Sequence, residues 1–232
     1  MTRRTDIQRD SRPASHQLYT DPEQKAALEA RNGLLQFDEV LRLIDQSSAG
    51  SRLRPSTLQR LQRLAIQDIY TCAGNYRTGP VYIAGTTHQP PPASEIAERV
   101  EEMCDYVNGN WGKSPLHLAA YVMWRLNWIH PFSGGNGRTS RAISYLVLCA
   151  RLGYRLVGTE TIPEQIVANR QPYYSALDAA DAAYVEGRID VTAMEGLLGQ
   201  MLAVQLSSVL VDAAASSSAV EPDPRAAEGL GS

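Results

Sequence analysis

The chain has 232 residues, of which 44% are hydrophobic and 20% charged, an ordinary balance for a globular protein. This length favours one domain with appended ends and a core large enough to fold without disulfides. The net charge of −3 gives no overall positive field, so we expect neither nucleic acid nor an acidic membrane as a partner. Without an apolar leader or a membrane-length apolar run, the sequence predicts a cytoplasmic protein.

The two ends of the chain differ in composition from the middle. Residues 1–19 mix charge with Ser and Pro, and residues 213–232 consist mainly of Ala, Ser, Pro, Glu and Gly. Both segments lack the apolar surface that offsets the entropy of ordering a chain, so we expect disordered tails. Residues 20–212 are then the folded domain, with an N-terminal helical extension before its main part.

The folded domain begins with helical patterns. The segment Thr20-Asp21-Pro22-Glu23 has the form of a capping box with Pro just inside the helix, which we expect to break at Asn32-Gly33 and resume through Ile44. Ser56 can cap a second helix with a leucine-rich face. Further on, the strand-like run at residues 81–84, set between Gly/Pro-rich stretches, predicts a single β-hairpin.

The sequence of the second half of the domain predicts a series of helices. Pro131 must end the helix that precedes it, because a proline disfavours the helical conformation of the residue before it. The expected helices start near Ser94, at Ser114-Pro115, near Arg138, in two segments around 163–184, and at Thr192. The sequence therefore predicts a mainly α-helical bundle with one small hairpin.

The segment His130–Arg141 (HPFSGGNGRTSR) carries the strongest chemical signal in the chain. Its glycines permit backbone conformations that direct several N–H groups to one point, and the next helix starts there with its positive dipole end. Arg138 and Arg141 lie three residues apart on one face, and guanidinium groups suit phosphate oxygens. The pattern predicts a cradle for an anion beside the imidazole of His130.

Acidic residues are missing around this loop. From Tyr106 through Thr159 the sequence contains no Asp or Glu, while it contains one lysine and five arginines. A stretch with only positive charge, folded around a glycine-rich turn, concentrates anions. No metal site is expected, because His117 and His130 are too far apart for a local zinc pair and no cysteine accompanies them.

At these residues the sequence resembles the Fic family, whose signature is HPFx[D/E]GNGRxxR. The match covers His130, Pro131, Phe132, the Gly135–Arg138 run and Arg141. Beyond the loop, residues 81–84 resemble the family's hairpin flap, and the segment around Asn169-Arg170 resembles its downstream helix. The resemblance implies the Fic fold over roughly residues 60–205.

The resemblance implies a protein adenylyltransferase (an AMPylase), which transfers AMP from the co-substrate ATP to a Ser, Thr or Tyr hydroxyl of a target protein. His130 would be the base that deprotonates this hydroxyl, with an unperturbed pKa near neutral pH. The residues implied to bind the nucleotide and its phosphates are Gly135, Asn136, Gly137, Arg138, Arg141, Asn169 and Arg170. The flap residues Val81, Tyr82, Ile83 and Ala84 would dock the target by main-chain pairing.

One position departs from the family pattern. The acidic residue that carries Mg²⁺ in the family is Gly134 here. Three alternatives stay open: transfer that relies on arginines and water, transfer of a different phosphate-containing group, or a catalytically silent Fic fold that binds nucleotide or another phosphate ligand. The use of Mg²⁺ is therefore undecided by the sequence.

Many Fic proteins carry an inhibitory helix with the pattern [S/T]-x-x-x-E-[G/N]. The segment Glu29-Ala30-Arg31-Asn32 lacks the leading Ser or Thr, and neither Ser94–Glu98 nor Thr192–Glu195 fits. Self-inhibition is not predicted, and a separate inhibitory protein is an open alternative. For Tyr76 and Arg77 the sequence allows either contact with nucleotide or target, or packing within the hairpin. For His88 it allows either such a contact or a solvated position in the loop.

Overall fold

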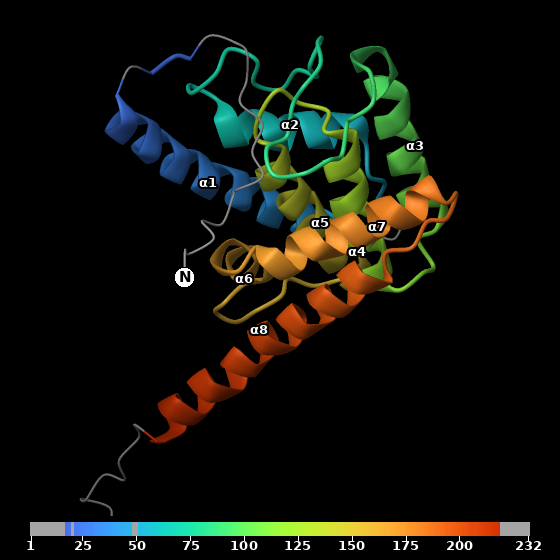
Figure 1. The fold of residues 1–232 in the computed structure, drawn as a ribbon. Coiled ribbons are helices and arrows are strands. Elements are labelled where there is room, and N and C mark those ends of the chain that lie inside the picture. Colours follow the sequence, from blue (N-terminus) through green and yellow to red (C-terminus); the bar gives the residue numbers. More distant parts are fainter. Residues whose placement is uncertain (1–16, 20, 48–50, 219–232) are drawn as a thin grey trace, which may run out of the picture.

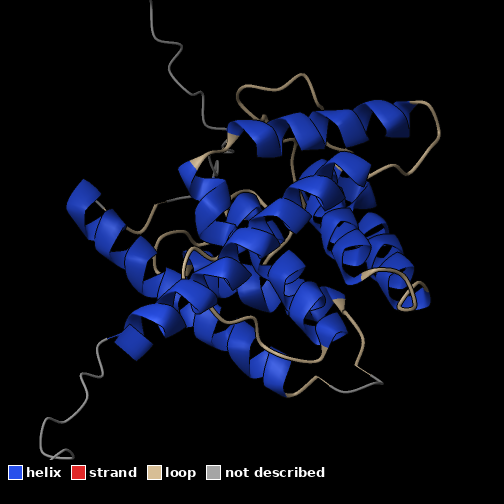
Figure 2. Cartoon of the chain, turned by 90° about the horizontal axis from the view of Figure 1, so that it is seen from below, coloured by secondary structure: helices blue, strands red, loops and turns tan. Residues whose placement is uncertain are grey.

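The computed structural model describes residues 17–19, 21–47 and 51–218, and within that part of the chain the regular structure is helical (Figures 1 and 2). The helices of this part are α1 (Pro22–Asp45), α2 (Pro55–Ile66), the short 3-10 helix η1 (Ala93–Glu95), α3 (Ile96–Gly109), α4 (Pro115–Ile129), α5 (Asn136–Leu152), α6 (Ile162–Ala168), α7 (Gln171–Val185) and α8 (Thr192–Ser218). The predicted helical class is confirmed.

Helices α4 and α5 pack against each other at the centre of the fold, and the other helices surround them (Figure 1). Both place large apolar side chains in the core: Trp124, Leu126 and Ile129 of α4 and Ile143 and Leu148 of α5 are at most 1% exposed. Packing of such apolar faces against neighbouring helices stabilises both helices. The loop that joins these two helices is therefore fixed at both ends by the core.

The described helices follow the predicted order, but the expected break in α1 is wrong, since α1 runs without interruption from Pro22 to Asp45. Asn32 and Gln36 face α2 and are buried, with Asn32 Nδ2 donating to the Gln67 carbonyl (2.7 Å) and Gln36 Nε2 to the Leu61 carbonyl (2.9 Å). These bonds hold the helix across Asn32-Gly33. Residue 20 lies outside the described part, and Asp21 caps the helix by accepting from the Glu23 N–H.

The predicted β-hairpin flap is also wrong: within the described residues, the segment 77–92 forms no strand. Prolines at 80 and 90–92 lack the N–H that a strand ladder needs. The buried guanidinium of Arg77 instead donates to the carbonyls of Gly79 (2.8 Å) and Pro91 (2.6 Å). One side chain thereby closes the loop that a hairpin was expected to close.

The boundaries of the expected tails differ from the structure where it describes them. Leu18 N–H donates to the Ile69 carbonyl (3.0 Å), so residues 17–19 contact the folded domain. Helix α8 continues to Ser218, beyond the expected limit at residue 212, and extends away from the body (Figure 1). The rest of both predicted tails lies outside the described residues. No helix in the described part is long and apolar enough to cross a bilayer.

The turn before α5 allows a stability prediction. Gly135 has φ of +76°, and a Cβ there would lie 2.8 Å from Ile66 Cγ2 of α2. Gly153 has a similar φ of +85° but open space around it. Both alanine variants suffer backbone strain, but only Gly135→Ala also suffers a clash. We expect Gly135→Ala to lower the free energy of unfolding by about 1–3 kcal/mol more than Gly153→Ala.

Urea denaturation of the two variants measures this difference directly. Equal losses for both would contradict the close packing of the turn against α2.

Candidate active site

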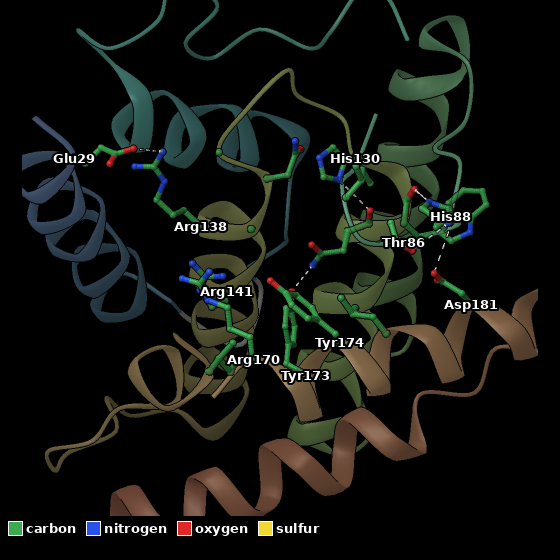
Figure 3. Close-up of a pocket in the computed structure, with 18 of the residues that line it drawn as sticks. Glu29, Thr86, His88, His130, Arg138, Arg141, Arg170, Tyr173, Tyr174 and Asp181 are labelled. Atoms are coloured by element: carbon green, nitrogen blue, oxygen red, sulfur yellow. Dashed lines mark hydrogen bonds and ion pairs between the residues drawn. The ribbon is translucent and has the colours of Figure 1, made fainter. Parts of the chain in front are cut away.

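A cavity of about 470 Å³ lies over the α4–α5 loop and brings together residues from widely separated parts of the chain. His130 stands between two polar groups: Arg138 and Arg141 on one side and His88 and Asp181 on the other (Figure 3). Helix α7 lines the floor with Tyr173, Tyr174 and Leu177.

His130 ends α4 in a left-handed conformation (φ 49°, ψ 58°), and the following proline disfavours the right-handed helical conformation at this residue. Arg77 stabilises this change of chain direction at the end of α4. Its Nε donates to the His130 carbonyl (2.8 Å), and its backbone N–H donates to the Pro131 carbonyl (2.9 Å). Arg77 is thus a positioning residue rather than a ligand contact, and Tyr76 packs against Phe132 (ring centroids 5.4 Å apart).

The imidazole of His130 is oriented by its own helix. Its Nδ1 lies 3.3 Å from the Asn127 carbonyl, so this nitrogen carries the proton and Nε2 is left as an acceptor. Burial lowers the pKa of His130 to about 3, and the charges of Arg77 and His88 act in the same direction. The expectation of an unperturbed pKa is wrong, because only 6% of this residue is exposed.

The glycine turn and the start of α5 form the predicted anion cradle. The amides of the first helical turn have no acceptor within their helix, and Thr139 N–H is the first to bond back, to the Gly135 carbonyl (2.9 Å). The side chain of Asn136 clamps the loop: it accepts from Phe132 N–H (3.0 Å) and donates to the Phe132 carbonyl (2.7 Å). Asn136 therefore shapes the cradle, and Gly135, Asn136 and Gly137 line the cavity.

The two loop arginines lie at this end of the cavity. A Cβ on Gly137 would be 3.4 Å from Arg141 Nη1, so the Arg141 guanidinium folds back over the glycine turn. Arg138 reaches α1, where its Nη2 lies 3.5 Å from Glu29 Oε1 (Figure 3). Glu29, set aside in the sequence because its motif is incomplete, thus contacts the cradle through the fold.

The opposite end of the cavity holds polar groups that the sequence did not assign. Nε2 of His88 lies 2.7 Å from the Trp128 carbonyl, and its Nδ1 lies 3.9 Å from Asp181 Oδ2. Trp124 Nε1 donates to Asp181 Oδ1 (2.7 Å). A helical spacing could have revealed this side of the site, since one face of α7 and its N-cap includes Arg170, Tyr173, Tyr174, Leu177 and Asp181.

Most of the predicted site residues meet in this cavity: His130, Gly135, Asn136, Gly137, Arg138, Arg141 and Arg170 line it. Asn169 does not; it is an exposed residue that ends α6. Of the predicted docking segment Val81, Tyr82, Ile83 and Ala84, only Ile83 lines the cavity, and Tyr82 is 79% exposed.

The residues present do not fit a protein-bound Mg²⁺ beside the arginines. Gly134 offers only a backbone carbonyl, which already accepts from Gln62 Nε2 (3.0 Å). The cavity's two carboxylates are Glu29, paired with Arg138, and Asp181 at the far end. Within the described part of the chain, no cluster of three or more His, Cys, Asp or Glu residues could hold a metal.

Comparisons with known proteins point to the same region of the chain that contributes the α4–α5 loop to the cavity. Residues 52–148 match the model of the Fic/DOC family. The matched region begins just before α2, includes the α4–α5 loop and ends in the last third of α5. Proteins named protein adenylyltransferase Fic are similar to this chain: that of Drosophila willistoni is 31% identical over 159 residues, covering 62% of this chain and 30% of the relative. The protein of Drosophila mojavensis is 36% identical over 110 residues, which cover 47% of this chain and 20% of that relative. Residues 52–148 of the chain therefore form a region of the Fic/DOC family.

Solved structures show the same fold. Fic-1 of C. elegans (residues 134–508) aligns with a TM-score of 0.60 at 22% identity, covering 79% of this chain and 52% of that one. A Fic-domain-containing signaling protein of Bacteroides thetaiotaomicron aligns with a TM-score of 0.61 at 21% identity, covering 79% and 71%. The chain spans about a third of the length of the first curated relatives it matches, so the likeness concerns the Fic domain.

The low pKa of His130 gives a pH prediction. The folded protein resists protonation at His130 until about pH 3, whereas an unfolded histidine takes up a proton near pH 6.5. Because the unfolded chain then binds more protons, this residue's contribution to stability is complete above about pH 6.5 and declines as the pH falls towards 3. We expect the His130 imidazole resonances to show no titration between pH 8 and pH 5.

Two-dimensional NMR of imidazole-labelled protein measures this, with His130→Gln identifying the resonance. A midpoint near pH 6.5 for that resonance would contradict the buried position of the ring.

The Arg138–Glu29 pair gives a second prediction. Glu29 offers Arg138 a carboxylate in the place where a phosphate would bind, so removing this charge favours the phosphate. We expect Glu29→Gln to tighten the binding of ATP by about two- to five-fold, the scale of a partly exposed ion pair.

Isothermal titration calorimetry measures the change, with Glu23→Gln at the exposed start of α1 as the matched control. Unchanged or weaker binding for Glu29→Gln alone would show that this carboxylate does not compete with ligand.

Proposed function

We propose that this protein is a Fic-type adenylyltransferase that transfers AMP from ATP to a hydroxyl side chain of a target protein. The observation that carries the proposal is the convergence of one oriented imidazole, the first turn of α5 and two loop arginines on a single cavity. The relatives named protein adenylyltransferase Fic, at about 31% identity, support the same reaction.

His130 is the base in this reaction. Its Nε2 accepts the proton of the target hydroxyl as the hydroxyl oxygen attacks the α-phosphorus of ATP. The new O–P bond forms while the bond from the α-phosphorus to the bridging oxygen breaks, and pyrophosphate leaves. The imidazolium formed is stabilised by the phosphate charge beside it, which offsets the burial that disfavours protonation in the empty site.

The glycine turn stabilises the charge that develops on the α-phosphate. Backbone amides at the start of α5 donate to its oxygens, and Asn136 keeps these amides in place through its two bonds to Phe132. Arg138 and Arg141 hold the outer phosphates and neutralise the departing pyrophosphate. These groups are fixed by the fold before ATP arrives, so little reorganisation accompanies the reaction.

The nucleoside lies towards α7 in this proposal. Tyr173, Tyr174 and Leu177 offer an aromatic and apolar wall, and Asp181 with His88 offers polar partners for the sugar or base. The segment 81–84 passes the mouth of the cavity, with Ile83 inward and Tyr82 exposed. Its unpaired backbone groups dock an extended segment of the target, even though no hairpin forms among the described residues.

The proposal predicts a separation of binding from transfer at His130. In His130→Ala the phosphate cradle is intact but the base is missing, so transfer should fall by at least about 100-fold while the dissociation constant for ATP changes little. ATP labelled at the α-phosphate, incubated with cell lysate or with the protein itself, measures transfer, and calorimetry measures binding.

The matched control is His117→Gln, which removes a histidine that contacts Glu195 and Tyr106 outside the cavity. Wild-type protein that binds ATP but labels no protein would instead identify a silent nucleotide-binding Fic fold.

A further inference from the structure

A third guanidinium faces the phosphate end of the cavity. Arg138 and Arg141 come from the first turns of α5, and Arg170 comes from the N-cap of α7 (Figure 3). Within the described part of the chain, no carboxylate lies within 4.0 Å of the Arg141 or Arg170 guanidinium, and Arg138 meets only Glu29, at 3.5 Å. The cavity thus concentrates positive charge with little counter-charge.

Two of these arginines occupy positions that helix electrostatics disfavours. The N-terminal end of a helix carries partial positive charge, which favours acidic residues there and opposes cations. Neither α5 nor α7 has an acidic residue in its first turn, and Arg138 and Arg170 stand at the two helix starts. A bound polyanion offsets this repulsion, whereas among the described residues only Glu29, at Arg138, supplies a nearby negative charge.

The same charges act on one another. Burial lowers the pKa of Arg141, and the nearby guanidiniums of Arg170 and Arg138 lower it further. Arg170 and Arg141 both line the same cavity, so an extended phosphate chain lying on Arg141 also passes Arg170.

A metal ion commonly neutralises a nucleotide's phosphates through protein carboxylates. The cradle supplies none for this purpose, since Gly134 has no side chain, Glu29 is paired with Arg138 and Asp181 lies at the far end. Guanidinium groups neutralise phosphate charge by direct, bidentate hydrogen bonds and need no metal.

We propose that this site binds the polyphosphate of its donor without a protein-bound metal ion, and that Arg170 is a third phosphate ligand alongside Arg138 and Arg141. The inference rests on the proposed function for the identity of the donor, ATP. It assigns to Arg170 the charge that a carboxylate-held cation would otherwise supply.

Calorimetric titration of the full chain with ATP, in buffer with EDTA and in buffer with MgCl₂, tests the proposal. We expect dissociation constants that agree within about three-fold in the two buffers. Binding that disappears in EDTA and returns with Mg²⁺ would overturn the inference and leave the proposed adenylyltransferase standing. The absence of ATP binding in both buffers would overturn the proposed function itself.

The role of Arg170 is tested by comparing ATP with AMP in EDTA. Arg170→Ala should weaken ATP binding by about 10- to 100-fold, the scale of lost hydrogen bonds between charged groups, and AMP binding much less. Arg170→Lys should recover part of the loss. The exposed Arg188, which pairs with Glu186, supplies the control Arg188→Ala. Equal losses for ATP and AMP, or no loss, would refute a phosphate contact.

Restoring a carboxylate tests the metal directly. In Gly134→Asp the loop regains the acid that it lacks, so Mg²⁺ should now tighten ATP binding by at least about ten-fold while the wild type shows no such effect. Equal Mg²⁺ dependence in both proteins would contradict the account.

Discussion

The reversal of the chain at His130 is the constraint on which the rest of the site depends. Proline at 131 excludes a helical conformation at His130, and the residue adopts φ of 49° instead. Arg77 then fixes the C-terminal end of α4, since its guanidinium bonds to the His130 carbonyl and to the loop carbonyls of Gly79 and Pro91. The imidazole, the glycine turn and the start of α5 keep their relative positions because this one joint is rigid.

Electrostatics explains why the site is poised for an anion. The imidazole is kept neutral by burial, whereas three guanidiniums and two helix starts surround the other end of the cavity. In the proposed function, polyphosphate supplies the missing negative charge and at the same time raises the affinity of the imidazole for a proton. In the proposed reaction, ligand and base are therefore coupled, and Glu29 of α1 is the one described carboxylate that pairs with Arg138.

Sequence periodicity was enough to predict the helical fold and the start of most helices, because the buried positions recur at helical spacing. The loop was predictable for a different reason: proline, three glycines and two arginines within twelve residues restrict both its conformation and its chemistry. The predictions that failed concern features that depend on contacts between segments far apart in the sequence. Nothing local shows that Asn32 and Gln36 bond to α2, or that Arg77 replaces a strand ladder. The His130 pKa and the approach of Glu29 also arise only from packing.

The central claim is that the start of α5, its arginines and His130 form one phosphate site. Titration of ¹⁵N-labelled protein with ATP, followed through amide and imidazole resonances, tests this most directly. The account predicts that the largest shifts fall together on Gly135, Gly137, Arg138 and the His130 ring, with one common dissociation constant. Shifts confined to residues away from the α4–α5 loop, with these resonances unmoved, would contradict it.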